Sequence, residues 1–172
     1  LRLLLADRGA EKAMSLSDRS GYTCLHAACL TGQRECAELL MAAGAEVDRM
    51  AKDGTTPIMA CSRSANSAIA ERLLQQGAEA THHDSFGSTI VHAACGSGGT
   101  NPKKGLIEAL ARHGQLSCSV NSMDNDGLAP LHVLCQAATR IPPRAPFEGP
   151  ASIIGEIVDH LIAAGASIDQ AD

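Results

Sequence analysis

The sequence has almost no aromatic residues. Its 172 residues include no Trp, one Tyr and two Phe, although 45% of them are hydrophobic. A core of this composition must be built from Ala and from aliphatic and sulfur-containing side chains. Aromatic and β-branched residues are enriched in sheets, so their scarcity favours closely packed helices over a sandwich or barrel. We therefore expect an all-α fold.

The sequence also lacks an excess of positive charge and any long apolar run. The formal net charge is −5, and no basic stripe typical of nucleic-acid binding is present. No segment approaches the roughly 18 consecutive apolar residues that span a membrane. We expect neither nucleic acid as a partner nor insertion into a membrane.

The cysteines lack the pattern of a disulfide framework. There are seven, an odd number, and no CxxC pair. Five lie on apolar stretches with helical spacing, where cysteine behaves as a small hydrophobic residue: Cys29, Cys36, Cys61, Cys95 and Cys135. This usage is typical of a reducing compartment, so we expect an intracellular protein of the cytoplasm or nucleus.

A histidine followed three residues later by a cysteine occurs three times. The stretches are HAAC at His26, HAAC at His92 and HVLC at His132. Residues three apart share one face of a helix, and His and Cys are both zinc ligands and a common catalytic pair. Taken alone, the motif fits a metal site, a nucleophile with its base, or a repeated structural unit.

Aligning these stretches reveals an internal repeat. The copies are DRSGYTCLHAAC, AKDGTTPIMACS, DSFGSTIVHAAC and DNDGLAPLHVLC, and they start at 18, 51, 84 and 124. Successive starts are thus 33, 33 and 40 residues apart. Periodicity of this size indicates a stacked array of small units.

Each copy ends in the same apolar helical pattern before a glycine. The closing glycines are Gly44, Gly77, Gly114 and Gly165. The residues four before them are Leu40, Leu73, Leu110 and Leu161, and the residues eight before them are Cys36, Ile69, Leu106 and Ile157. With Met41, Leu74 and Ile162 beside the leucines, the spacing predicts one buried helical stripe drawn four times.

Local chemistry predicts the rest of the unit. Asp followed three residues later by Gly is typical of a type I turn. Thr23, Thr56 and Thr89 can cap a helix start, and Pro57 and Pro130 suit a first helical position. The closing glycine fits the left-handed residue after a helix. Each unit therefore reads as turn, short helix, turn, second helix and Gly-terminated loop.

This unit resembles the ankyrin repeat, which is marked by T-P-L-H-x-A and a later G-A. The matching stretches are TCLHAA, TTPIMA, STIVHAA and APLHVL, followed by GAEVD, GAEA and GASID. The resemblance implies an all-α ankyrin-repeat solenoid with projecting hairpin fingers. It divides one domain, 1–172, into a partial repeat at 1–17 and repeats at 18–50, 51–83, 84–123 and 124–172. We expect a piece of a longer array or of a larger protein.

The resemblance also implies that the His–Cys pairs are structural. In the family the histidine hydrogen-bonds backbone at the start of the first helix, and the cysteine position is a small-residue slot between repeats. The second unit has Met59 and Ser62 instead, so the motif is interrupted. Each intact copy supplies two ligands, whereas a structural zinc site takes four. We expect no metal, no cofactor, no catalytic set and hence no enzyme.

Function in such arrays resides in positions that the scaffold does not need. The resemblance implies a concave groove, formed by fingers and first helices, that binds a protein or an extended peptide. Tyr22 and Phe86 are the aromatic anchors expected there, unless each merely packs on a neighbouring turn. The expected binding residues are Arg19, Tyr22, Leu30, Met50, Lys52, Asp53, Arg63, His83, Phe86, Asn125, Asp126, Leu128 and Gln136.

Two insertions lie between the helices of the third and fourth units. GSGGTNPKKG lacks the GxxxxGK[ST] spacing and preceding strand of a phosphate-binding loop, so that interpretation is rejected. RIPPRAP fits the spacing of an SH3-type ligand, with Arg140, Pro143 and Pro146 as contacts. The alternative is an ordered proline-rich spacer.

The sequence therefore predicts a protein–protein interaction module, expected to be monomeric. Two alternatives stay open, because the flanking sequence decides between them. One is the substrate-receptor array of a ubiquitin-ligase adaptor, and the other is the regulatory array of a larger enzyme or channel.

Overall fold

Helices alternate with tight turns throughout the computed structural model, which describes residues 14–64, 66–96, 103–139 and 150–167. The helices within these ranges are α3 (Cys24–Thr31), α4 (Arg34–Ala42), α5 (Pro57–Ser64), α6 (Ser67–Gln75), α7 (Ile90–Gly96), α8 (Lys104–Arg112), α9 (Leu116–Ser119), α10 (Pro130–Thr139) and α11 (Pro150–Ala163). Extended pairing in the same ranges is limited to an isolated bridge between Ser17 and Thr23.

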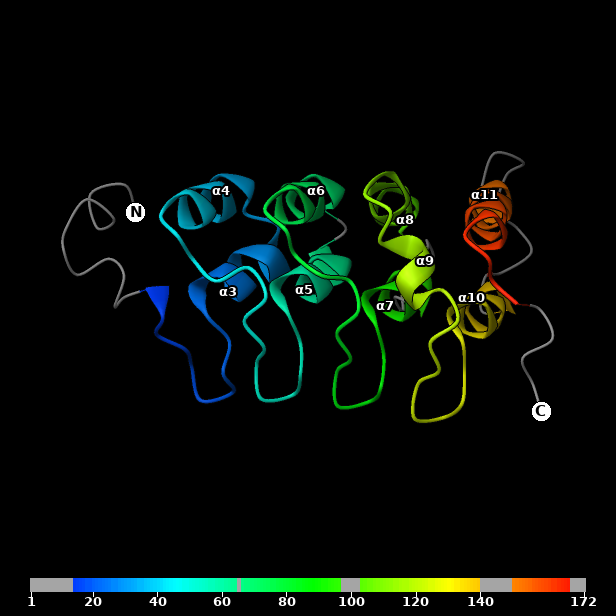
Figure 1. Cartoon of the computed structure of the whole chain (residues 1–172), viewed down its shortest axis with the longest axis horizontal. Helices are drawn as coiled ribbons and strands as arrows, with labels where there is room; N and C mark the ends of the chain where they lie inside the picture. Colours follow the sequence, from blue (N-terminus) through cyan, green and yellow to red (C-terminus); the bar gives the residue numbers. More distant parts are fainter. Residues whose placement is uncertain (1–13, 65, 97–102, 140–149, 168–172) are drawn as a thin grey trace.

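The helices form two layers of a solenoid (Figure 1). The first helices of the pairs, α3, α5, α7 and α10, lie side by side in one layer, and the second helices, α4, α6, α8 and α11, form the other. Four turns project beyond the first-helix layer, at residues 18–22, 51–55, 84–88 and 124–128; these are the fingers. The predicted all-α solenoid is confirmed.

The core lies between the two layers and between successive pairs. Leu40, Leu73, Leu110 and Leu161 are all buried, as are Ile69, Leu106 and Ile157 one turn earlier. First helices contribute Leu25, Ile58 and Val91 to the same cluster. The predicted apolar stripe of the second helices is therefore the inner face that meets the first helices.

All four fingers share one pattern of backbone hydrogen bonds. In the third finger the amide of Asp84 donates to Ser88 O, and the amide of Gly87 donates to Asp84 O. Asp84 Oδ1 accepts from the amides of Phe86 and Ser88, both at 2.9 Å. The second finger starts with Ala51 and lacks this carboxylate, so Asp53 accepts from the amide of Thr55 instead.

Backbone hydrogen bonds join each finger to the next. The amide of Lys52 donates to Ser20 O at 2.9 Å, that of Ser85 to Asp53 O at 2.7 Å, and that of Asn125 to Phe86 O at 2.9 Å. These bonds fix the spacing of the fingers, so the side chains on them form a continuous surface.

The residues after Gly114 form a short helix, α9, that the sequence did not predict. Leu116, its first residue, and Val120, directly after it, are buried and extend the core. Ser119 Oγ donates to Ala80 O at 2.8 Å, which ties the segment to the preceding pair. The extra residues of the third unit are thus part of the packed structure.

Two apolar positions expected in the interior lie at the surface. Cys135 on α10 is exposed, and Ile162 on α11 is 47% exposed. Their counterparts Cys29, Cys95 and Leu74 are buried. In the described part of the chain α10 and α11 are the last pair, so no further pair covers these side chains there. The expectation that both are buried was wrong for this reason.

Some expectations fall on residues outside the described ranges. They include most of the partial repeat at 1–17, the glycine-rich part of the third-unit insertion, and Arg140, Pro143 and Pro146 of the SH3-type motif. Among the helices of the described ranges, none has the length and apolar character needed to cross a membrane.

Candidate functional site

Two of the three motif histidines, His26 and His92, connect a first helix to the following finger, while His132 accepts from the amide of Ala129 at the start of α10. The amide of Thr89 donates to His92 Nδ1 at 3.1 Å, and the Thr89 hydroxyl lies 2.9 Å from the same nitrogen. On the other side of the ring, His92 Nε2 lies 2.9 Å from Leu128 O. Because Nδ1 accepts from an amide, the proton resides on Nε2, which donates to that carbonyl. His26 makes the same contacts with Thr23 and with Thr55 O.

Burial lowers the pKa of both His26 and His92, because a charged ring would lose its hydration and the acceptor role of Nδ1. Both rings therefore lie neutral between two units. The predicted hydrogen bond to backbone is confirmed, and each ring additionally reaches the next finger.

The second unit lacks this connection. Met59 occupies the histidine position and is buried. The Thr56 hydroxyl, expected to cap the helix, is the buried side-chain polar atom without a hydrogen-bond partner among the described residues. The cap prediction is therefore wrong for Thr56, which also lacks the ring nitrogen that lies beside the hydroxyls of Thr23 and Thr89.

Three of the seven cysteines have the character of core residues. Cys29, Cys61 and Cys95 are buried, and burial raises the pKa of the Cys95 thiol to about 12. A hydrogen bond with Cys29, together with burial, raises the pKa of Cys61. Thiols in this state are poor nucleophiles and poor metal ligands at neutral pH. Within the part of the chain that the structure describes, no three His, Cys, Asp or Glu side chains are grouped to hold a metal ion.

Two adjoining hollows form a groove between the fingers and the first helices. The larger hollow, about 600 Å³, extends from Arg63 at the end of α5 to Val133 on α10. The smaller, about 220 Å³, extends from Phe86 to Tyr22 and Asp53. The two hollows share lining residues, which are Ser62, Arg63, Asp84, Ser88 and Ala93. Together they form the concave groove.

The expected binding residues are distributed unevenly over this surface. Four of them line the concave groove, namely Tyr22, Asp53, Arg63 and Phe86. Another seven are exposed but do not line it, namely Arg19, Met50, Lys52, His83, Asn125, Asp126 and Gln136. The remaining two, Leu30 and Leu128, are half-buried.

Sequence reasoning missed several groove residues. Asp84 and Asp124 had been assigned only to the turns, and Lys103 and Val133 were not singled out for the groove. Lys103 directly precedes α8 and comes from the third-unit insertion. The sequence could have placed Lys103 in the groove, because an insertion between two paired helices ends close to the last turn of the first helix.

The two aromatic residues of the fingers differ in role. Tyr22 is half-buried, its ring packs edge-on against His26 at a centroid distance of 5.2 Å, and its hydroxyl donates to Asp53 Oδ2 at 2.8 Å. Burial, chiefly, raises the pKa of Tyr22. Phe86 is 73% exposed. Tyr22 therefore links two fingers, while Phe86 presents its ring to solvent.

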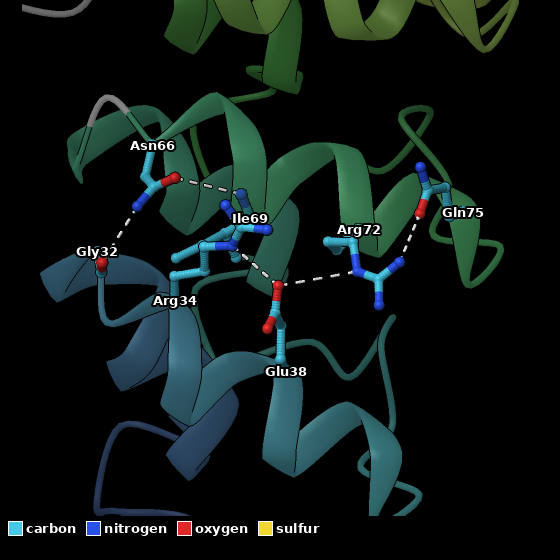
Figure 2. Close-up of polar contacts among 7 residues, drawn as sticks. All are labelled: Gly32, Arg34, Glu38, Asn66, Ile69, Arg72 and Gln75. Atoms are coloured by element: carbon cyan, nitrogen blue, oxygen red, sulfur yellow. Dashed lines mark hydrogen bonds and ion pairs between the residues drawn. The ribbon is translucent and has the colours of Figure 1, made fainter.

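Polar contacts join neighbouring second helices on the opposite surface (Figure 2). Glu38 Oε1 on α4 lies 2.9 Å from Arg34 Nε and 3.9 Å from Arg72 Nε on α6. Asn66 accepts from the amide of Ile69 at the start of α6 and donates to Gly32 O. Ion pairs Arg112–Glu71 and Lys104–Glu156 continue the series to α8 and α11. Every lysine and arginine of α4, α6 and α8 is thus paired.

The basic side chains on the concave side, in contrast, form no ion pair with the described residues. Arg63 and Lys103 in the groove, and Arg19 and Lys52 on the fingers, have no carboxylate within 4.0 Å among the described residues. In the part of the chain that the structure describes, the basic side chains of α4, α6 and α8 form ion pairs, whereas these four on the concave side do not.

Comparison with known proteins identifies the repeat unit. A family model described as ankyrin repeats in three copies matches residues 1–84 and again 58–141. The chain is 36% identical over 110 residues to the mouse protein fem-1 homolog A-like, covering 63% of this chain and 17% of that protein. It is 29% identical over 128 residues to the human transient receptor potential cation channel subfamily A member 1, covering 74% of this chain and 11% of the channel.

A third relative is the Arabidopsis thaliana ADP-ribosylation factor GTPase-activating protein AGD2, 35% identical over 74 residues, which are 43% of this chain and 10% of that protein. The chain thus spans less than a fifth of the length of each of these relatives. What they share with it is the repeated helical unit.

Proposed function

Because the chain belongs to the ankyrin repeat family, we propose that it is a protein-interaction module that binds a partner protein or extended peptide in the concave groove. One observation carries this proposal. The groove is lined by side chains that the fold does not use, above all the exposed ring of Phe86 and the unpaired guanidinium of Arg63. Aromatic residues and arginine are enriched among the side chains that dominate binding energy at interfaces.

The proposal extends to the binding residues and to the setting of the domain. Phe86, Arg63 and Asp53 form the centre of the contact surface, and the exposed residues of the fingers form its rim. Tyr22 contributes through its ring but also supports the fold, because its hydroxyl donates a hydrogen bond to Asp53.

The free state of all seven cysteines supports a reducing, intracellular setting. The division into repeats at 18, 51, 84 and 124 is part of the same proposal.

A second candidate function is a regulatory array inside a larger protein. The similarity to a cation channel and to a GTPase-activating protein, each matched over about a tenth of its length, favours this candidate. A regulatory array also acts by binding a segment of protein, so the same groove serves both candidates.

Calorimetric titration of the partner obtained by affinity purification tests the groove. Phe86→Ala removes an exposed ring, so we expect binding to weaken by about 1–3 kcal/mol with little change in stability. The matched control is Gln75→Ala on the exposed side of α6, which should bind like the unmodified protein. Loss of affinity in the control with full affinity in Phe86→Ala would place the binding site elsewhere.

A further inference from the structure

Two unpaired cations converge on the concave groove from different elements. Arg63 comes from the end of α5 and Lys103 from the residue before α8, and both line the larger hollow. Neither side chain makes a hydrogen bond or ion pair with the described residues, whereas Arg34, Arg72, Lys104 and Arg112 on the second helices all do. The groove therefore holds two positive charges that have no acceptor among the described residues.

The carboxylates in the same hollow, unlike the two cations, already have hydrogen-bond partners. Asp84 Oδ1 accepts from the amides of Phe86 and Ser88, and Asp124 Oδ1 accepts at 3.0 and 2.9 Å from the amides of Asp126 and Leu128. Amide dipoles thus already stabilise both negative charges inside their own fingers. No described residue gives comparable stabilisation to the guanidinium of Arg63 or the ammonium of Lys103.

This difference determines what can cover the groove. A partner that removes water from an unpaired cation must supply an acceptor, because an uncompensated buried charge is strongly unfavourable. Covering the aspartates costs less, since each keeps its two amide hydrogen bonds. Arg63 also lines the smaller hollow, where the exposed ring of Phe86 offers an apolar contact beside the charge.

We propose that the occupant of the groove is an extended acidic segment of a partner protein, in which an Asp or Glu side chain pairs with Arg63 and Lys103 and a neighbouring apolar side chain packs on Phe86. This inference rests on the proposed function and adds the chemistry of the partner to it. A planar guanidinium suits a carboxylate because it can form two parallel hydrogen bonds with it.

Selection of peptides by the purified chain tests the proposal without a known partner. The probe is a phage-displayed library of random peptides of about twelve residues, long enough to span the groove in an extended form. Selected sequences are synthesised and their Kd values measured by fluorescence anisotropy. The variants are Arg63→Gln and Lys103→Gln, with Arg72→Gln as the matched control because Arg72 is an exposed arginine of the opposite surface.

The expected result is enrichment of Asp or Glu next to an apolar residue. Arg63→Gln should weaken binding of such a peptide about three- to tenfold, and Arg72→Gln should leave Kd within about twofold. Changing the Asp or Glu of the peptide to Asn or Gln should weaken binding by the same factor. When the changed peptide is combined with Arg63→Gln, the two losses of affinity should not add.

Two outcomes would overturn the inference in different ways. Selection of Lys- or Arg-containing peptides that bind Arg63→Gln normally but lose affinity for Asp84→Asn would refute the acidic partner and leave the groove as the binding site. Asn retains the acceptor oxygen of the turn, so that variant keeps the finger. Peptides that bind Arg63→Gln and Phe86→Ala normally but lose affinity for Arg72→Gln would refute the groove as well.

Discussion

Single side chains decide how the units are held to one another. His26 and His92 each accept a hydrogen bond from the threonine that precedes the helix, and each ring reaches a carbonyl of the next finger. The same residue thus closes a helix start and joins two units. In His26 and His92 this double contact requires a neutral imidazole with its proton on Nε2.

Replacing His92 by Ala should lower the free energy of unfolding by about 1–3 kcal/mol, because it leaves the buried amide of Thr89 without its acceptor and removes one of the two hydrogen bonds to Leu128 O. His113 at the end of α8 makes no such connection between units, so His113→Ala is the control. Denaturant unfolding followed by circular dichroism measures both. Equal stability of the two variants would contradict the role assigned to His92.

The same substitution has an expected pH dependence. The folded pKa of His92 lies below its ordinary value of about 6.5, so the unfolded chain binds more protons between the two values. The stabilisation by neutral His92 is complete above about pH 7 and is lost as pH falls below 6.5 towards the lowered folded pKa. His92→Ala should therefore lose stability less steeply over this range than the unmodified protein, and an identical slope would refute the assignment.

At the scale of the elements, the fingers depend on how closely their backbones approach one another. Gly54 has a φ of 77°, and a Cβ added to it would lie 2.7 Å from His83 O, directly before the next finger, and 2.9 Å from Cα of Asp84 within it. Gly127 has a φ of 74°, and nothing described lies within 4 Å of such a Cβ. Two glycines with the same backbone conformation thus differ in whether another finger packs against them.

Gly54→Ala should destabilise the array more than Gly127→Ala. Both substitutions carry the cost of a left-handed alanine, about 1–2 kcal/mol, and only the first adds a clash with backbone. The difference in the free energy of unfolding, measured by denaturant titration, isolates the packing between fingers. If the two variants are equally stable, the fingers do not hold each other in place.

The helix pairs were predictable because their signals are local. The spacing of Leu40, Leu73, Leu110 and Leu161 before the closing glycines is a property of the chain alone, and so is the Asp-to-Gly interval of the turns. Helix α9 was not predictable in this way. Its four residues are helical because Leu116 packs into the core between pairs, which is a tertiary effect.

The candidate site was predictable only in part, for a related reason. Family resemblance placed Arg63 and Phe86 on the concave side, but it could not show that Tyr22 is held by Asp53. That contact exists because the second finger has its aspartate at position 53, where the carboxylate faces the first finger. Nor could the sequence show which lysines and arginines form ion pairs, since pairing with a carboxylate of the neighbouring unit depends on the three-dimensional geometry.

The whole molecule has two surfaces of different character. On the second helices, charges pair with charges of the adjacent unit, from Glu38 and Arg72 to Lys104 and Glu156. Exposed ion pairs of this kind contribute little individually, but each interface between described units has one. On the concave side the unpaired charges and the exposed aromatic ring remain available. In a solenoid each unit contacts only its neighbours, so a binding surface must be assembled from several units in this way.

Hydrogen–deuterium exchange of the chain with and without its bound partner tests this division of surfaces most directly. Contact in the concave groove should slow amide exchange in the fingers at 51–55 and 84–88 and at the ends of α5 and α7. The amides of α4, α6 and α8 should exchange as they do in the free protein. Protection confined to α4, α6 and α8, with unchanged exchange in the fingers, would contradict the account.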